Sequence, residues 1–156
     1  MILIVSLIKA GMPDCKTIHG MQIQAFASLL EKYQDFNTNP GAEKLERIVQ
    51  RMQQDFTDYY FIQVNNKNIG VIRILRLKDN ICRISPMFIL PEHQGYGYAQ
   101  QAIVLAELLY PQATSWTLDT IKQELKLCHL YEKMGYKPTG KEEDIQDGMT
   151  IIYYAK

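Results

Sequence analysis

The stretch from Ile81 to Leu109 constrains the fold most, because a strand-like run, a glycine-containing turn and a helical run follow one another there. Ile81 to Leu90 is rich in β-branched and apolar residues, which is typical of a strand. Pro86 lies inside this run. Proline cannot donate to a sheet ladder, so Pro86 predicts a bulge or a place where neighbouring strands stop pairing.

The turn contains two glycines, Gly95 and Gly97, and a helix is expected from about Gly97 to Leu109. Glycine lets the backbone turn tightly and approach a ligand without interference from Cβ. The first turn of a helix carries unpaired N–H groups and a partial positive charge. Together these features suit an anion such as a pyrophosphate, although plain turn geometry explains the glycine pair as well. Gln100 stands where a dinucleotide-binding fingerprint needs glycine, and no Gly-Lys-Ser/Thr follows as in a P-loop.

The run Gln94-Gly-Tyr-Gly-Tyr-Ala99 resembles the Gln/Arg-x-x-Gly-x-Gly/Ala signature of the GNAT superfamily of N-acetyltransferases. The preceding Ile89-Leu-Pro91 is similar to the hydrophobic-x-Pro sequence that ends the family's fourth strand. In that family the fourth strand carries a bulge and splays away from the fifth. Pro86 predicts such a disruption independently.

The resemblance implies acetyl-coenzyme A as co-substrate and assigns two backbone segments to it. Three strand residues would pair with the pantetheine arm like an added strand, and the N–H groups of the turn would hold the pyrophosphate. The expected cofactor-binding residues are Met87, Phe88, Ile89, Gln94, Gly95, Tyr96, Gly97, Tyr98, Ala99 and Gln100. The side chains of Tyr96 and Tyr98 need not touch the cofactor.

Tyr131 is the candidate catalytic residue. Leu127, Leu130, Tyr131 and Met134 are spaced as one face of a helix, so simple core packing is one explanation for the tyrosine. However, Leu130-Tyr-Glu-Lys-Met-Gly-Tyr136 resembles a GNAT motif whose first tyrosine donates a proton to the departing thiolate of coenzyme A. A thiol has a pKa of about 8.5 and a tyrosine about 10, so the hydroxyl is protonated at neutral pH and suits this role.

The sequence departs from the family in two ways. Glu124 stands seven residues before Tyr131, where many members have asparagine. No carboxylate lies between Ile81 and Leu90, where many members carry the general base. The amine proton would then leave through water or through Asp119, Glu92 or Glu124. A solvated or capping carboxylate is the alternative interpretation of all three.

The remaining pattern predicts one domain over residues 1–156 with the order β-α-α-β-β-β-α-β-α-β-β. The expected fold class is α/β (α+β), with a mixed, mostly antiparallel sheet flanked by helices and splayed fourth and fifth strands. The apolar run from Met1 to Ile8 is interpreted as a first, buried strand. A signal peptide would open with basic residues, whereas Lys9 follows the run.

Composition limits the classes of partner. Hydrophobic residues make up 47% and charged residues 22%, and Lys+Arg and Asp+Glu are 17 each. The zero net charge favours neither nucleic acid nor a membrane surface as partner. The three cysteines and three histidines lack metal-ligand spacing, so no metal is expected, and reduced cysteines indicate a cytoplasmic protein.

The acceptor is expected near Tyr33, Asp35 and Asn37, because in the family the loop between the first two helices often lines the acceptor site. Asp35 could attract a cationic amine, although an exposed loop aspartate is the commoner case. Three functions stay open: acetyl transfer to a small-molecule amine in a ternary complex, transfer to a protein or peptide, and a module that binds acyl-coenzyme A without turnover. A homodimer is a further expectation, since this fold often pairs through its sheet.

Overall fold

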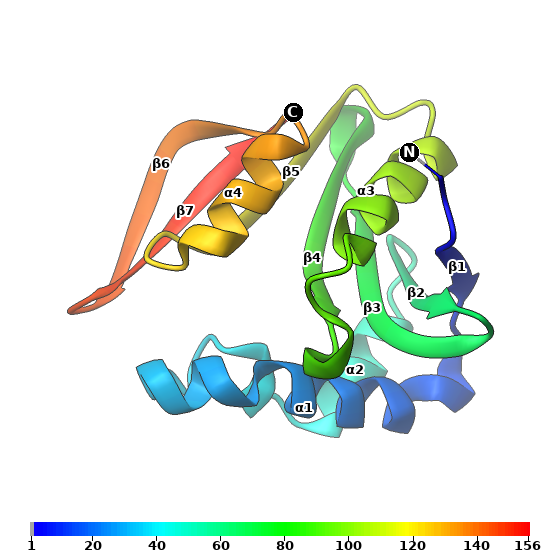
Figure 1. Ribbon diagram of the computed structural model, residues 1–156, viewed down its shortest axis with the longest axis horizontal. Helices are drawn as coiled ribbons and strands as arrows, with labels where there is room; N and C mark the ends of the chain where they lie inside the picture. The colour runs from blue at the N-terminus through cyan, green and yellow to red at the C-terminus, as the bar shows by residue number, and fades with distance from the viewer. Residues whose placement is uncertain (1) are drawn as a thin grey trace.

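The central sheet has seven strands in the order β1-β2-β3-β4-β5-β7-β6, in the computed structural model that describes residues 2–156 (Figure 1). The strands are β1 (Ser6–Lys9), β2 (Thr57–Val64), β3 (Lys67–Arg76), β4 (Ile81–Ile89), β5 (Ser115–Ile121), β6 (Lys137–Gln146) and β7 (Met149–Ala155). The helices are α1 (Cys15–Tyr33), α2 (Leu45–Met52), α3 (Tyr98–Leu109) and α4 (Leu125–Lys133). Neighbouring strands are antiparallel except β4 and β5, so the predicted mixed, mostly antiparallel sheet flanked by helices is confirmed.

The helices cover the two faces of the sheet in pairs. On one face α1 and α2 pack against Tyr59, Phe61 and Val71. On the other face α3 and α4 pack against a cluster that includes Trp116 and Leu118. These residues come from strands whose apolar side chains point to both faces, as expected for a sheet buried between two helical layers.

The sheet opens between β4 and β5. Their parallel pairing joins Ile81–Arg83 to Ser115–Thr117 and goes no further among the described residues. Beyond it the two strands diverge, and α1 runs below the open end (Figure 1). On the other side of β4, Ile72 faces Met87 but Ile74 faces Ile84. Two β4 residues, Ser85 and Pro86, therefore oppose the single residue Arg73, and the bulge predicted from Pro86 is confirmed.

Arg73 holds this bulge in place. Its buried guanidinium donates to the Ser85 carbonyl at 2.9 Å, to Thr57 Oγ1 at 3.0 Å and to Gln54 Oε1 at 3.2 Å. Burial lowers the pKa of Arg73 to about 10, and the group stays charged at neutral pH. A charged side chain in the middle of β3 thus supplies the hydrogen bonds that the irregular backbone of β4 needs.

The N-terminal run differs from the expectation. Of the residues predicted as a buried strand, Met1 lies outside the described part, and Ile2, Leu3 and Ile4 are exposed. β1 begins only at Ser6 and is an edge strand paired with β2, so the prediction of a buried strand was wrong. An apolar sequence alone does not determine whether its strand lies in the middle of the sheet or at the sheet edge.

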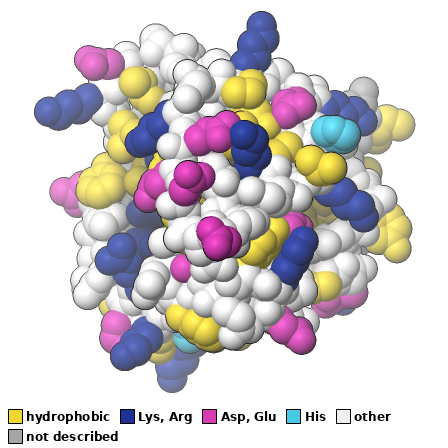
Figure 2. Space-filling view, turned by 90° about the vertical axis from the view of Figure 1, so that its left-hand side faces the viewer, with side chains coloured by type: hydrophobic (Ala, Val, Ile, Leu, Met, Phe, Trp, Pro, Cys, Tyr) yellow, Lys and Arg dark blue, Asp and Glu magenta, His cyan; other side chains and the backbone are white. Residues whose placement is uncertain are grey.

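One face of the surface mixes charges of both signs. Figure 2 shows acidic, basic and apolar side chains interspersed on the β6 side of the molecule. No helix within residues 2–156 is both long and apolar enough to cross a membrane.

Candidate active site

Two hollows meet where β4 and β5 diverge. The first has a volume of about 340 Å³ and lies between β4, the glycine turn and α4. The second has a volume of about 290 Å³ and lies between α1, the loop after it, β4, β5 and β7. The residues that line both are Met87, Phe88, Ile89, Gln94, Leu127 and Tyr131. A molecule in the first hollow can therefore reach a molecule in the second beside Tyr131.

The open edge of β4 lines both hollows, and its residues alternate in direction. The Leu90 N–H donates to the Ile69 carbonyl at 2.8 Å, so the backbone of Leu90, and of Phe88 two residues earlier, faces β3. The backbone groups of Met87 and Ile89 consequently face the open side. Gln94 Nε2 donates to the Ile89 carbonyl at 2.8 Å, which ties the glycine turn to the strand. Of the three strand residues proposed from sequence, Met87 and Ile89 direct their backbone to the open edge, where the Ile89 carbonyl already accepts from Gln94, whereas Phe88 contributes its side chain.

The glycine turn leaves open space above the start of α3. Gly95 has φ +86° and Gly97 has φ +79°, and a Cβ added at either would have no described atom within 4 Å. The first bond of α3 runs from the Gln101 N–H to the Gly97 carbonyl at 3.3 Å, so the N–H groups of the preceding helical residues have no partner within the helix. This turn fits a pyrophosphate, as the sequence suggested.

The sequence-predicted residues of the turn line the first hollow with one exception. Those that line it are Gln94, Gly95, Gly97, Tyr98, Ala99 and Gln100. The side chain of Tyr96 is 66% exposed and stacks on Tyr98, with ring centroids 5.6 Å apart, and Tyr96 does not line the hollow.

Sequence analysis missed Lys126, which also lines the first hollow. Its ammonium group is a natural partner for a phosphate. Lys126 lies four residues before Leu130 and therefore on the same side of α4. That spacing was the signal that could have identified it.

Replacing Gly97 with alanine is expected to raise the Kd of coenzyme A about tenfold, measured by isothermal titration calorimetry. The added Cβ would occupy the space above the turn, whereas the strain of about 1–2 kcal/mol from a side chain at φ +79° lowers the stability of the free and the bound protein alike. Gly140→Ala is the matched control, because Gly140 has φ +95°, also faces open space and lies on β6, away from both hollows. Equal Kd values for the two variants would contradict this assignment of the turn.

Tyr131 is held by the local structure at the end of α4. The Tyr136 N–H donates to the Tyr131 carbonyl and the Gly135 N–H to the Glu132 carbonyl, both at 3.0 Å. Gly135 has φ +94°, and the rings of Tyr131 and Tyr136 pack edge to face at 6.3 Å. This is the Schellman arrangement with its usual apolar contact, so the predicted cap at Gly135 also positions the tyrosine.

The environment keeps the Tyr131 hydroxyl protonated. Burial raises the pKa of Tyr131 well above its ordinary value, and the negative charge of Asp119 raises it further. The side chain is buried in the protein, yet the residue lines both hollows. A protonated hydroxyl at this junction can donate a proton to a leaving group.

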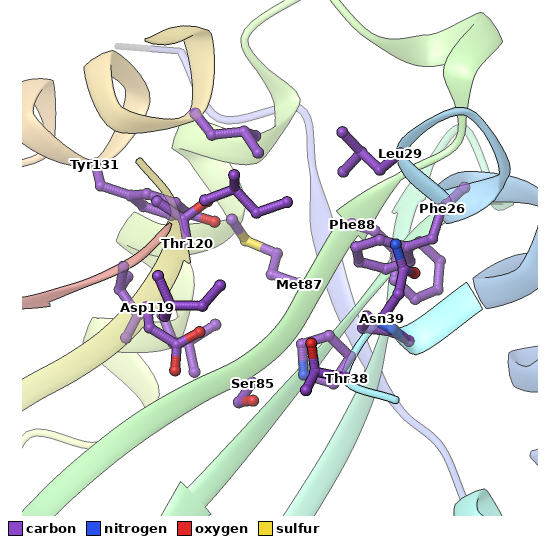
Figure 3. Close-up of a pocket in the computed structure, with 18 of the residues that line it drawn as sticks. Phe26, Leu29, Thr38, Asn39, Ser85, Met87, Phe88, Asp119, Thr120 and Tyr131 are labelled. Atoms are coloured by element: carbon purple, nitrogen blue, oxygen red, sulfur yellow. The ribbon is translucent and has the colours of Figure 1, made fainter. Parts of the chain in front are cut away.

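Asp119 is the one of the three candidate bases that lines the second hollow. It accepts a hydrogen bond from Arg83 on β4, and Figure 3 shows it on the same side of the hollow as Tyr131. Glu92 is exposed in a short 3-10 turn, Pro91–His93. Glu124 accepts from the Tyr33 hydroxyl at 2.5 Å and from Lys32 Nζ at 2.7 Å, and lines neither hollow.

The acceptor residues expected from sequence lie beside the second hollow and do not line it. Asp35 is buried, and it accepts from the backbone N–H groups of Asn37 and Thr38 at 3.2 and 3.1 Å. Its charge therefore orders the loop, so neither the substrate role nor the exposed-loop alternative holds. Tyr33 is buried and donates to Glu124, and Asn37 is exposed.

The loop nevertheless contributes to the second hollow through residues that follow Asp35. Its lining residues are Thr38, Asn39, Pro40 and Glu43. The loop expected near the acceptor therefore lines the second hollow, through residues other than Tyr33, Asp35 and Asn37. Which residues of a short loop face inward depends on its turn geometry, and here Asp35 sets that geometry.

The far end of α1 bounds the second hollow. Gln146 Nε2 donates to the Tyr33 carbonyl at 2.6 Å, and Glu124 binds the Tyr33 hydroxyl. Tyr33 also packs on Ile121 and Met149. These contacts join α1 to the β5–β7 half across the open end of the sheet, so they close the second hollow at that end.

Comparison with known proteins agrees with this architecture. Residues 26–136 match the model of the acetyltransferase (GNAT) family. No curated protein matches the chain significantly. A spermidine N-acetyltransferase from Vibrio cholerae, solved with coenzyme A and spermine, is similar in structure with a TM-score of 0.76 at 20% identity, over 98% of this chain and 95% of that one.

Two further solved structures are similar. An acetyltransferase from Thermus thermophilus has a TM-score of 0.75 at 14% identity and covers 99% of this chain and 97% of its own. A ribosomal L7/L12 alpha-N-protein acetyltransferase in complex with coenzyme A has a TM-score of 0.73 at 13% identity, over 97% and 93%. At such identities these structures support the fold, whereas the family model matches well over half of the sequence. The chain therefore belongs to the acetyltransferase (GNAT) family.

Proposed function

We propose that this protein transfers the acetyl group of acetyl-coenzyme A directly to a primary amine of a small molecule, with both substrates bound together. One observation carries the proposal: the two hollows meet at Tyr131, and the second is closed at one end where α1 is joined to the β5–β7 half. A volume of about 290 Å³ lies at the lower end of small-molecule sites. A protein or peptide acceptor would need a longer groove.

The first hollow suits the donor. Met87 and Ile89 offer backbone groups to an extended amide chain, and the turn at Gly95 and Gly97 offers N–H groups to a pyrophosphate. Acetyl-coenzyme A supplies an activated thioester. Spermidine and protein N-acetyltransferases of this fold are solved with coenzyme A, which supports the same donor here.

Tyr131 and Asp119 share the proton transfers in this proposal. The Tyr131 hydroxyl holds a proton where the thiolate develops, and its raised pKa keeps that proton in place at neutral pH. Asp119 lies in the second hollow and takes the amine proton, directly or through water. Free cysteine nucleophiles are not needed, since the three thiols are buried and none lines either hollow.

The proposal is tested by the release of free coenzyme A from acetyl-coenzyme A in the presence of a panel of primary amines and of peptides with free N-termini. Thiol release with at least one small amine, and none with the peptides, is the expected result. Release with peptides alone would establish the protein acceptor instead. Binding of coenzyme A without release from any acceptor would establish a binding module.

Asp119→Asn is expected to lower kcat/KM for the best amine about 10- to 100-fold, because it removes the proposed base. Arg83→Gln is the matched control, since it breaks the same ion pair and leaves the Asp119 carboxylate in place. It is expected to retain activity within a few fold. Equal losses in the two variants would mean that the ion pair matters only for structure.

Two further expectations from the sequence stay proposals. A cytoplasmic location is supported by three free, buried cysteines, which accord with a reducing compartment. A homodimer is compatible with β1, whose outer edge is unpaired among the described strands. Light scattering after size-exclusion chromatography measures the molar mass and so tests whether the protein is a homodimer.

A further inference from the structure

We propose that the acceptor is an amine with a single positive charge and an apolar, ring-sized body, and that polyamines are poor substrates. This inference rests on the proposed acetyl transfer and specifies its substrate class. It follows from the charges, the apolar wall and the position of Tyr131 in the second hollow.

The carboxylates around the second hollow are already paired with arginines. Glu43 accepts from Arg51 Nη1 and Nη2, at 2.9 and 2.6 Å, and from Gln22 Nε2 at 2.7 Å. Asp119 accepts from Arg83. The two ion pairs together carry no net charge, with Glu43, Arg51 and Asp119 lining the hollow and Arg83 outside its lining.

Asp119 can bind one ammonium group close to Tyr131, and its carboxylate is then shared between this group and Arg83. The second and third ammonium groups of a polyamine would lie farther along the hollow. There the remaining carboxylate, Glu43, already has its arginine, and the positive charge of Arg51 opposes another cation. Taking such charges out of water without a free partner is costly.

The end of the hollow opposite Tyr131 is apolar. Phe26 and Phe88 pack edge to face there, with ring centroids 5.7 Å apart, and Leu29 lies beside them (Figure 3). The further apolar residues of the wall are Ile84, Pro86, Leu118, Ile121, Met149 and Ile151. An amine held between Tyr131 and Asp119 would extend its body toward the two phenylalanines, where an aromatic ring gains both burial and edge-to-face contact.

The polar groups at that end are largely engaged within the protein. Thr38 Oγ1 donates to Asp35, and Asn39 Oδ1 accepts from the Gly41 N–H at 2.7 Å. Both side-chain oxygens are bonded within their own loop. They therefore offer little compensation for a charged or strongly polar substrate tail.

The test compares 2-phenylethylamine with spermidine, which have nearly the same number of non-hydrogen atoms. Two quantities are measured on the wild-type protein: kcat/KM for thiol release, and the Kd of each amine for the coenzyme A-saturated protein by calorimetry. We expect 2-phenylethylamine to have a kcat/KM at least tenfold higher and a Kd at least tenfold lower. A preference for spermidine in either quantity would overturn the inference and leave the acetyl transfer intact.

The calorimetric arm separates the two proposals. If no amine releases thiol but 2-phenylethylamine still binds more tightly than spermidine, the proposed transfer fails and the assignment of the hollow stands. If 2-phenylethylamine neither binds nor reacts while coenzyme A binds, the assignment of the hollow is wrong.

A charge placed in the hollow should reverse the preference. Leu29→Glu adds an unpaired carboxylate beside Phe26 and is expected to change the ratio of the two kcat/KM values at least tenfold in favour of spermidine. Ser28→Glu is the matched control, because Ser28 is exposed on α1 and does not line the hollow. If both variants change the ratio equally, general attraction of cations explains the effect and the inference fails. If Leu29→Glu unfolds, Phe26→Leu takes its place and should weaken 2-phenylethylamine binding severalfold without affecting coenzyme A.

Discussion

Tyr131→Phe is expected to lower kcat about 100-fold or more and to leave the Kd of coenzyme A nearly unchanged. The substitution removes one hydroxyl at the junction of the two hollows and keeps the ring that packs on Tyr136 and Tyr154. A positioned acid typically contributes a factor of about 100 to 10,000. Steady-state thiol release and calorimetry measure the two quantities.

Tyr136→Phe is the matched control for Tyr131→Phe. Its ring touches that of Tyr131, but its hydroxyl donates to Glu107 at 3.1 Å and lies on no wall of the two hollows. This variant should lose about 1 kcal/mol of stability and keep its kcat within a few fold. A Tyr131→Phe protein with wild-type kcat would remove Tyr131 from the chemistry and reduce it to core packing.

The raised pKa of Tyr131 adds a check on the pH profile. Burial and the charge of Asp119 raise it, so the hydroxyl remains protonated as pH rises through the ordinary tyrosine range. Loss of activity on the alkaline side should therefore not reflect ionisation of Tyr131. If the wild-type activity declines with a pKa of about 10 and Tyr131→Phe shows no such decline, the pKa of Tyr131 is not raised, and this description of its environment is wrong.

Gly70→Ala is expected to lower the free energy of unfolding by about 3 kcal/mol, the largest effect on stability that we foresee. Gly70 lies on β3 opposite Ile89, where the strands approach closely. An added Cβ would overlap the Phe88 carbonyl oxygen and lie 3.0 Å from Ile89 Cδ1. Because the carbonyl belongs to the backbone, β4 itself would have to move. Urea denaturation followed by circular dichroism measures the change.

Gly20→Ala is the same substitution as Gly70→Ala, but it is expected to raise the free energy of unfolding. Gly20 is exposed in α1, and its added Cβ would meet no described atom within 4 Å. Alanine is the better helix former by about 1 kcal/mol, so this variant should be more stable than the wild type. Similar stabilities for the two variants would show that β3 and β4 can separate at Gly70 without loss.

The turn that we propose to hold the donor was predictable from the sequence because its geometry is local. Gly95 and Gly97 adopt positive φ values that glycine favours, and a helix begins directly after them. Gly135 ends α4 and thereby positions Tyr131 four residues earlier. Pro86 interrupts the ladder within its own strand. Each of these features depends on backbone conformations within a few residues.

The sequence did not determine which of several residues of the same type lies at the site. Asp119, Glu92 and Glu124 are chemically alike in the sequence, and only packing brings Asp119 to the second hollow and binds Glu124 to α1. The sequence position of Asp35 suits a partner for an amine, but only the folded loop determines that its carboxylate accepts from the backbone of that loop.

By itself, the sequence determined the family, the strand–turn–helix that would hold the donor, and the capped helix that carries Tyr131, because hydrogen bonds between close neighbours and the φ values of glycine produce them. Tertiary structure alone decided the second hollow, which we propose to hold the acceptor. Its walls come from α1, the following loop, β4, β5 and β7, which are brought together by long-range strand pairing and by burial of apolar faces. The same long-range contacts placed β1 at the sheet edge and paired Asp119 with Arg83.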